Sequence, residues 1–154
     1  MKLFFYPPVL ASISATICIS IIAYLSEISN EYILLMIPTF GASVVLITAL
    51  PTSPLARPRN IFFGHLISAS AGIIIGATMG VTFYTIGIAV GLAILFMMLT
   101  DRLHPPAGGN PILVMISGTV LDYNVLPLAV GVTIILLYSI IFNKIILKRE
   151  YPWF

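Results

Sequence analysis

The chain has 154 residues, of which 60% are hydrophobic and only 8% charged, with a net charge of +2 at pH 7. A soluble domain carries about a quarter charged residues, so the composition excludes a water-soluble protein and predicts an integral membrane protein. The seven basic residues are too few and too scattered to form a nucleic-acid-binding face. The single Cys18 excludes an intrachain disulfide and a thiolate metal cluster, and we expect no cofactor.

The length suits one all-α transmembrane domain over residues 1–154, with about 20 apolar residues for each crossing. Residues 61–100 hold His65 and no charged side chain. As one helix this stretch would be about 60 Å long, twice the thickness of the hydrocarbon core, so it must fold back near residues 80–84. The six expected segments are residues 9–25, 32–50, 61–81, 83–99, 103–121 and 125–142.

The distribution of charge predicts the orientation of these segments. With the N-terminus inside and six crossings, all seven basic residues lie inside, whereas Glu27, Glu31 and Asp122 lie outside. A five-span arrangement would leave the basic tail at residues 144–149 outside. The positive-inside rule therefore favours six crossings with both termini cytoplasmic, and we expect the plasma membrane of a bacterium or cyanobacterium.

Two of the six segments have irregular sequences. Pro38 and Gly41 fall inside the second segment, which predicts two half-helices joined at residues 39–43. The stretch 101–118 around the fifth segment contains two charges, a histidine, three prolines and paired glycines. Irregular backbone at membrane depth is tolerated only where it is buried in protein or lines a cavity. These two segments are therefore the first places to look for function.

The two irregular segments match each other. Sliding the chain by 67 residues places 38–43 on 105–110, each with a proline, small residues and a polar residue before a short apolar run. The chain then divides into a first repeat of about 9–81 and a second of about 83–143. Because each unit has three segments, the units run in opposite directions. Such a 3+3 inverted repeat with broken helices is typical of secondary transporters.

The broken helices predict a site for a small inorganic anion. Ser43 and Asn110 are good N-cap residues, each just before a short helix. Helix N-termini present unpaired N–H groups and partial positive charge, and glycines let a ligand approach the backbone near the bilayer midplane. The candidate substrate-binding residues are Thr39, Gly41, Ala42, Ser43, His65, His104, Gly108, Gly109 and Asn110.

Several of these assignments have structural alternatives. His104 is equally suited to a gating or proton-linked role and to a structural hydrogen bond, and His65 to a functional role and to bonding a carbonyl freed by a proline. Asp101 and Arg102 are expected to form a local ion pair. Arg57 and Arg59 are topology signals first; together with Asn60 and Arg102 they also predict an electropositive vestibule.

Two kinds of catalytic site find little support. A metal site is not expected, since no acidic residue lies inside a segment. An enzyme is a distant alternative, with a pairing of Ser43 and His65 left open.

Small residues recur every fourth position on the third segment, at Gly64, Ser68, Gly72, Gly76 and Gly80, and again at residues 87 and 91. Small residues on one stripe let helices approach closely in lipid. We expect close packing inside the protein or in a dimer rather than a pore lining.

The motif L-H-P-P-A-G-G at 103–109 resembles the signature of the HPP family of small integral membrane proteins. The resemblance extends to residues 40–43, 53–60, 64–65 and 68–69, and so covers the core from about 38 to 118. Two departures are Gly109-Asn110-Pro111, where Ala-Thr or similar is expected after the first glycine, and Arg57, where glutamine is more usual. The resemblance implies a membrane transporter, with nitrite as the leading substrate because nitrite transport is attributed to photosynthetic members.

Two classes of function follow. The first is a transporter or channel for a small anion; the second is a non-transporting membrane subunit or scaffold that packs through the glycine stripe. Six short spans enclose little space, so we expect at least a homodimer in the lipid bilayer.

Overall fold

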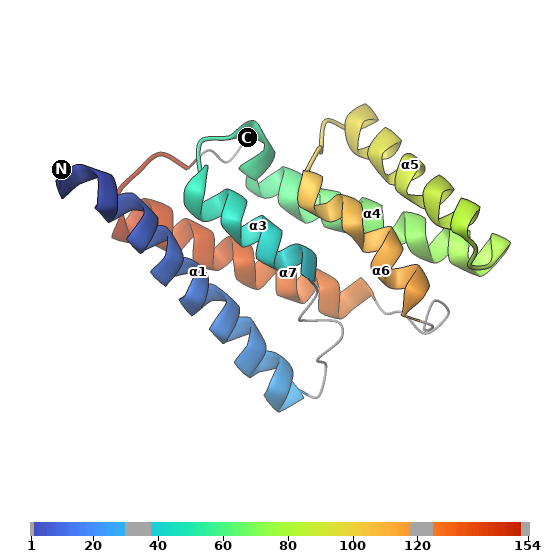
Figure 1. Cartoon of the computed structure of the whole chain (residues 1–154), viewed down its shortest axis with the longest axis horizontal. Helices are drawn as coiled ribbons and strands as arrows, with labels where there is room; N and C mark the ends of the chain where they lie inside the picture. Colours follow the sequence, from blue (N-terminus) through green and yellow to red (C-terminus); the bar gives the residue numbers. More distant parts are fainter. Residues whose placement is uncertain (1, 30–37, 118–124, 152–154) are drawn as a thin grey trace.

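The computed structural model describes residues 2–29, 38–117 and 125–151, and all the regular structure in these ranges is helical (Figure 1). The helices are α1 (Lys2–Ser29), α3 (Pro38–Ala49), α4 (Pro58–Met79), α5 (Phe83–Leu99), α6 (Asn110–Ile116) and α7 (Val125–Ile140). Two 3₁₀ turns, η1 (Pro54–Ala56) and η2 (Pro105–Gly109), precede α4 and α6, and a π-helical segment, η3 (Ile141–Ile146), continues α7.

Three stretches of 22 residues are long and apolar enough to cross a membrane: Pro8–Ser29, Pro58–Met79 and Val125–Ile146. Helices α5, of 17 residues, and α3, of 12, are shorter. Large apolar side chains are exposed on the outside, with Phe83 at 89% and Leu99 at 72% exposure, as a lipid-facing surface requires. The fold is that of an all-α integral membrane protein, and the count of six crossings stays a prediction.

The predicted reversal between the third and fourth segments is confirmed. Helix α4 ends at Gly80, whose positive φ of 74° suits a residue without a Cβ. Thr82 then begins α5 with a capping box, in which its hydroxyl accepts from the Thr85 amide and the Thr85 hydroxyl accepts from the Thr82 amide. This stretch therefore forms two antiparallel helices, α4 and α5, joined by a short turn at residues 80–82.

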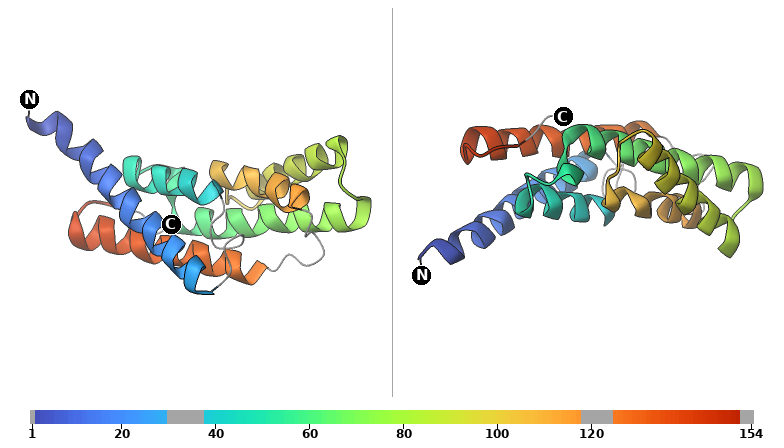
Figure 2. Two further views of the ribbon diagram at one scale, coloured as in Figure 1. Left: turned by 60° about the horizontal axis from the view of Figure 1, so that its bottom comes forward. Right: turned by 90° about the horizontal axis from the view of Figure 1, so that it is seen from above.

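Helix α4 is the central element, and α5, α6 and α7 all pack against it (Figures 1 and 2). Its small residues permit very close contacts with the residues that precede α6 and with the first turn of α6 itself. A Cβ on Gly64 would lie 2.8 Å from the His104 Cβ, and one on Gly72 would lie 2.7 Å from the Pro111 Cα. Close packing inside the protein, which the stripe predicts, is confirmed at these positions. Gly87 and Gly91 on α5 have no such neighbours.

The predicted break at residues 39–43 is wrong, because α3 is continuous from Pro38 and Ser43 lies well inside it. The rest of the predicted second segment, residues 32–37, lies outside the described residues. The fifth segment has the expected irregular form: residues 102–104 lie outside any helix, and η2 then leads into the seven-residue α6. The predicted end of this segment, at 118–121, again lies outside the described residues.

The two short helices begin at one place in the molecule. The Thr39 hydroxyl in the first turn of α3 donates to Oδ1 of Asn110, the first residue of α6, at 2.7 Å. From this contact α3 and α6 run away from each other (Figure 1). Their head-to-head arrangement agrees with the expected approach of the two matched motifs. The internal duplication itself stays a prediction.

Candidate functional site

A cluster of polar side chains is fully buried where α3, α4 and η2 meet. Ser43, His65 and His104 have 0% exposure and Asn110 has 1%. We call these four residues and the half-buried Thr39 the polar cluster. Phe40 packs edge-on against the His65 ring, with 5.4 Å between ring centroids, and the two histidine rings are 5.2 Å apart. Ionisable and polar groups are expensive to bury inside a membrane, which makes this cluster the candidate functional site.

Each element contributes to the cluster for a local reason. Helix α3 presents Thr39, Phe40 and Ser43 on one face, since residues three and four apart are neighbours on a helix. Gly64 lets His104 approach α4 next to His65. Pro105 disfavours the helical conformation at His104, the residue before it, and His104 accordingly has φ −137° and ψ 96°. The motif thus fixes where the second histidine enters.

The outer ends of the cluster determine which imidazole nitrogens carry protons. His104 Nδ1 lies 2.8 Å from the Leu55 carbonyl, which can only accept, so this nitrogen carries a hydrogen. His65 Nδ1 lies 2.9 Å from Asn110 Nδ2, which can only donate, so a neutral His65 carries its hydrogen on Nε2. Both assignments follow from the hydrogen-bond network.

Ser43 connects the two rings. Its Oγ lies 2.9 Å from His65 Nε2 and 2.8 Å from His104 Nε2. His65 therefore donates to the hydroxyl, and the hydroxyl donates to the lone pair of His104. All donors then point the same way, from Thr39 through Asn110, His65, Ser43 and His104 to Leu55. The polar cluster is a single directional chain of hydrogen bonds.

This series of hydrogen bonds can accept one extra proton, and each histidine ring then keeps its hydrogen bond to Ser43. The Ser43 hydroxyl has a second acceptor, the Thr39 carbonyl, at 3.0 Å. When His104 is protonated on Nε2, that nitrogen donates to Ser43, and the hydroxyl hydrogen turns to the Thr39 carbonyl. Ser43 Oγ then accepts from both rings with its two lone pairs. The pairing of Ser43 with His65 that the sequence left open is thus present, within a completely buried network.

The cluster differs from the expected anion site in detail. Neither Ser43 nor Asn110 is an N-cap. Ser43 lies inside α3. Asn110 is the first residue of α6, and the cap position before it is Gly109, which makes no side-chain cap bond. The Asn110 amide instead donates to His65 Nδ1 and to the His65 carbonyl at 3.1 Å. Gly41 and Ala42 are exposed, and Gly108 and Gly109 are half-buried. A Cβ on Gly109 would lie 2.9 Å from Thr39 Cγ2, so this glycine permits the contact between the short helices.

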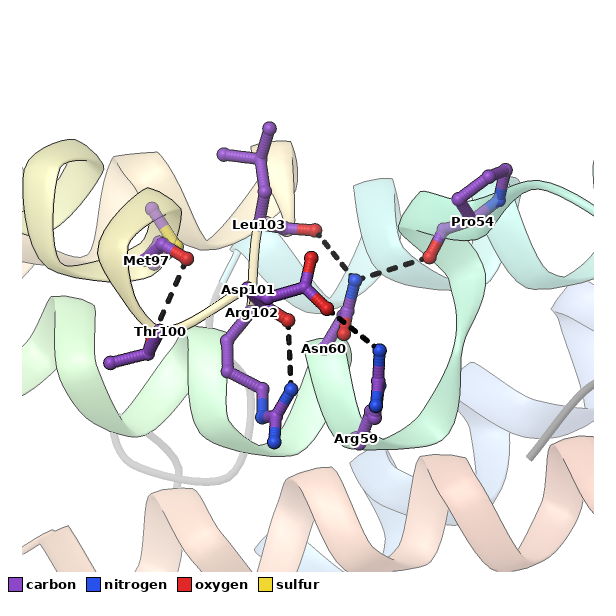
Figure 3. Close-up of polar contacts among 8 residues, drawn as sticks. All are labelled: Pro54, Arg59, Asn60, Met97, Thr100, Asp101, Arg102 and Leu103. Atoms are coloured by element: carbon purple, nitrogen blue, oxygen red, sulfur yellow. Dashed lines mark hydrogen bonds and ion pairs between the residues drawn. The ribbon is translucent and has the colours of Figure 1, made fainter. Parts of the chain in front are cut away.

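Three of the predicted vestibule residues, Arg57, Arg59 and Asn60, lie at the start of α4, and Arg102 follows α5. Figure 3 shows Arg59, Asn60 and Arg102. The expected ion pair of Asp101 with Arg102 is wrong, because the Asp101 carboxylate pairs with Arg59 at 2.8 Å. Arg102 donates to the Asp101 main-chain carbonyl and lies 5.7 Å from the centre of the Phe63 ring. Asp101 has a positive φ of 55° after the last turn of α5, which redirects its side chain toward α4.

Asn60 has a structural role in this region. Its side-chain amide donates to the carbonyls of Pro54 and Leu103 at 3.2 and 3.3 Å (Figure 3). Asn60 therefore connects the irregular residues before His104 to the turn that contains Leu55. Ser68, farther along α4, holds η2 by donating to the Ala107 carbonyl. These three hydrogen bonds hold η1 and the segment that carries His104 against α4.

Sequence reasoning missed two parts of this arrangement. The first is the Leu55 carbonyl, because a main-chain acceptor leaves no trace in the side-chain pattern. The second is the C-terminal segment, which folds back onto the 48–57 region through Arg149 and the buried Tyr151. The pairing of a terminal aromatic with a distant loop has no local signal, although the shared basic character of both segments is visible.

Comparison with known proteins identifies the family. The protein-family model described as "HPP, transmembrane region" matches residues 6–152. Two proteins of Dictyostelium discoideum, both named only as transmembrane proteins, are 35% and 34% identical over 94% and 93% of this chain. The chain spans about half the length of these relatives, 49% and 53%. No solved structure matches. The chain belongs to the HPP family of transmembrane proteins.

Proposed function

We propose that this protein transports a small inorganic anion across the membrane, with the polar cluster as its binding site and nitrite as the leading substrate. The observation that supports it is the buried cluster of neutral hydrogen-bond donors at the common start of α3 and α6. The hydroxyls of Thr39 and Ser43 and the amide of Asn110 supply these donors. Nitrite as the substrate rests on the family resemblance.

An anion would bind by replacing bonds that the cluster makes to itself. Breaking the contact between Thr39 and Asn110 frees the Thr39 hydroxyl to donate to the anion, near the first-turn main-chain N–H groups and partial positive charge of α3. The Asn110 side-chain amide would donate to the anion after leaving His65. A proton on His104 would add positive charge next to the bound anion, which favours transport of anion and proton together.

The experiment is uptake by the purified protein in liposomes. Nitrite, nitrate, formate and chloride are compared with and without a proton gradient. We expect saturable nitrite uptake that an inward proton gradient accelerates. Asn110→Asp should abolish it, because a carboxylate repels the anion and cannot donate to His65. Asp101→Asn, which removes a charge outside the cluster, is the control. Normal nitrite uptake by a folded Asn110→Asp variant would refute this site.

A second candidate is a non-transporting subunit or a homo-oligomer that packs through small residues. The α4 stripe is occupied internally, but Gly87 and Gly91 are exposed on α5. Exposed small residues four apart favour contact with another helix in lipid. This candidate predicts a stoichiometric partner after gentle purification and no stabilisation by anions. Crosslinking through cysteines introduced at positions 87 and 91 tests whether the partner is a second copy.

A further inference from the structure

A second polar region lies at the basic end of the molecule, away from the polar cluster. A cavity of about 770 Å³ opens between the turn before α4 and the chain after α7. Its lining contains four cationic side chains and one carboxylate. The lining residues are Thr52, Arg57, Lys144, Lys148, Arg149, Glu150 and Tyr151. We call it the basic cavity.

The wall formed by the C-terminal segment is fixed to the rest of the fold. Lys148 has a positive φ of 50°, which reverses the chain after η3. Arg149 then donates to Asn143 Oδ1 at 2.6 Å and to the Thr48 carbonyl at 2.8 Å. Tyr151, only 3% exposed, donates to the Ala56 carbonyl at 3.0 Å. Burial raises the pKa of the Tyr151 phenol above its ordinary range, so this donor stays protonated.

The opposite wall contains an unsatisfied donor. Arg57 Nε is buried and has no hydrogen-bond partner among the described residues. Arg57 also immediately precedes α4, whose first turn adds partial positive charge. A buried guanidinium nitrogen without an acceptor costs free energy. Arg57 also lines the cavity together with three other cationic side chains, and this concentration of positive charge makes the cavity complementary to an anion with several acceptor oxygens.

The location indicates the chemical class of the ligand. Ile145 and Ile146, next to Lys144 in η3, are 65% and 61% exposed, as expected for lipid-facing side chains. Cations beside a lipid-facing surface lie at headgroup level, and basic pockets at this level bind anionic headgroups. The volume is also in the range of ordinary ligand pockets, about 300–1,000 Å³, and exceeds what a three- or four-atom anion needs.

We propose that the basic cavity binds a phosphate group, carried by an anionic phospholipid headgroup or by a soluble phosphate compound. Arg57 and Arg149 approach from opposite walls, and Lys144 and Lys148 add positive charge. Glu150 is exposed and opposes binding. This site contains none of the residues of the polar cluster, although Arg57, one of the predicted vestibule residues, lines it.

The test measures thermal unfolding of the full chain in nanodiscs of neutral phosphatidylcholine. One arm adds phosphatidylglycerol to the nanodisc, and the other adds inorganic phosphate to the buffer. A ligand that binds only the folded state raises the melting temperature with its concentration. A rise with phosphatidylglycerol alone supports a lipid headgroup as the natural ligand, and a rise with phosphate supports a soluble one. No rise in either arm overturns the proposal.

Two exposed residues give variants with opposite expected effects. Lys148→Gln should weaken binding about fivefold, the loss of one cation near an anionic surface, and Glu150→Gln should strengthen it. Arg102→Gln removes a positive charge at the same end but outside the cavity and should leave binding unchanged. Equal weakening by Lys148→Gln and Arg102→Gln would show general surface attraction and would overturn the proposal. Nitrite uptake should be unaffected by Lys148→Gln, so the two proposals fail separately.

Discussion

The polar cluster and the basic cavity hold polar groups in opposite ways. In the cluster, the side chains of Ser43, His65, His104 and Asn110 are buried and bond to one another in a continuous series that begins at the half-buried Thr39 and ends at the Leu55 carbonyl. In the cavity, charged side chains share an open space, and a buried Arg57 nitrogen lacks a partner. Burying a neutral network costs little once every group is bonded, whereas several cations around one space favour a counter-ion. The cluster therefore satisfies its own polar groups, and the cavity concentrates positive charge that favours an anion.

The packing that encloses the cluster gives the largest expected effect. Gly72→Ala should lower the free energy of unfolding by about 3 kcal/mol, because its Cβ would meet the Pro111 backbone, which cannot turn away. Equilibrium unfolding in mixed micelles measures the change. Gly87→Ala, at a position with no neighbour within 4 Å, should be nearly neutral. Similar losses for the two variants would contradict the interior packing described for α4.

The polar cluster gives the next largest expected loss of stability. Ser43→Ala should destabilise the fold by about 2 kcal/mol, because the Nε2 atoms of both His65 and His104 lose their partner while buried. Ser12→Ala removes a hydroxyl of the same kind that is exposed and bonds only within α1, so it serves as the matched control. The same unfolding measurement applies. A neutral Ser43→Ala would mean that the rings find other partners.

A substitution in the wall of the basic cavity should have a smaller effect on the free energy of unfolding. Arg149→Gln removes the bonds to Asn143 and Thr48 at a partly exposed site, and we expect a loss of about 1 kcal/mol. Limited proteolysis after Lys148 should become faster, since the segment is released. Glu150→Gln leaves these bonds in place and should keep the wild-type cleavage rate. Unchanged cleavage in Arg149→Gln would show that Tyr151 alone holds the segment.

The exposed ion pair should contribute least. Arg59→Gln and Asp101→Asn should each cost about 0.5 kcal/mol, because Asp101 is 82% exposed and water screens the pair. The double variant should lose no more than the larger single loss. High salt should reduce the difference from wild type. A cost that persists in high salt would indicate that Asp101 also positions the residues before His104.

Much of the fold could be predicted because membrane helices depend on apolar length and on glycine. The reversal at Gly80, the small-residue stripe of α4 and the irregular form of the 103–116 segment all follow from local composition. The break at 39–43 was wrong because Pro38 begins the described helix. Proline is tolerated in a first turn, so it does not interrupt α3.

The members of the site could be predicted better than their bonds. Thr39, Ser43, His65, His104 and Asn110 were all candidates, since intramembrane polar residues are rare enough to stand out. Their partners depend on how three segments dock, which the pattern of one chain does not specify. Asn110 therefore reads as an N-cap in the sequence, although in the structure its amide orients His65. The Arg59 pair with Asp101, 42 residues apart, was missed for the same reason.

Ser43 joins three elements through one oxygen atom. It belongs to α3, it meets His65 of α4, and it meets His104 at the start of η2. A movement of α3 would therefore change the contacts to both histidines together, so the position of this helix couples the two rings.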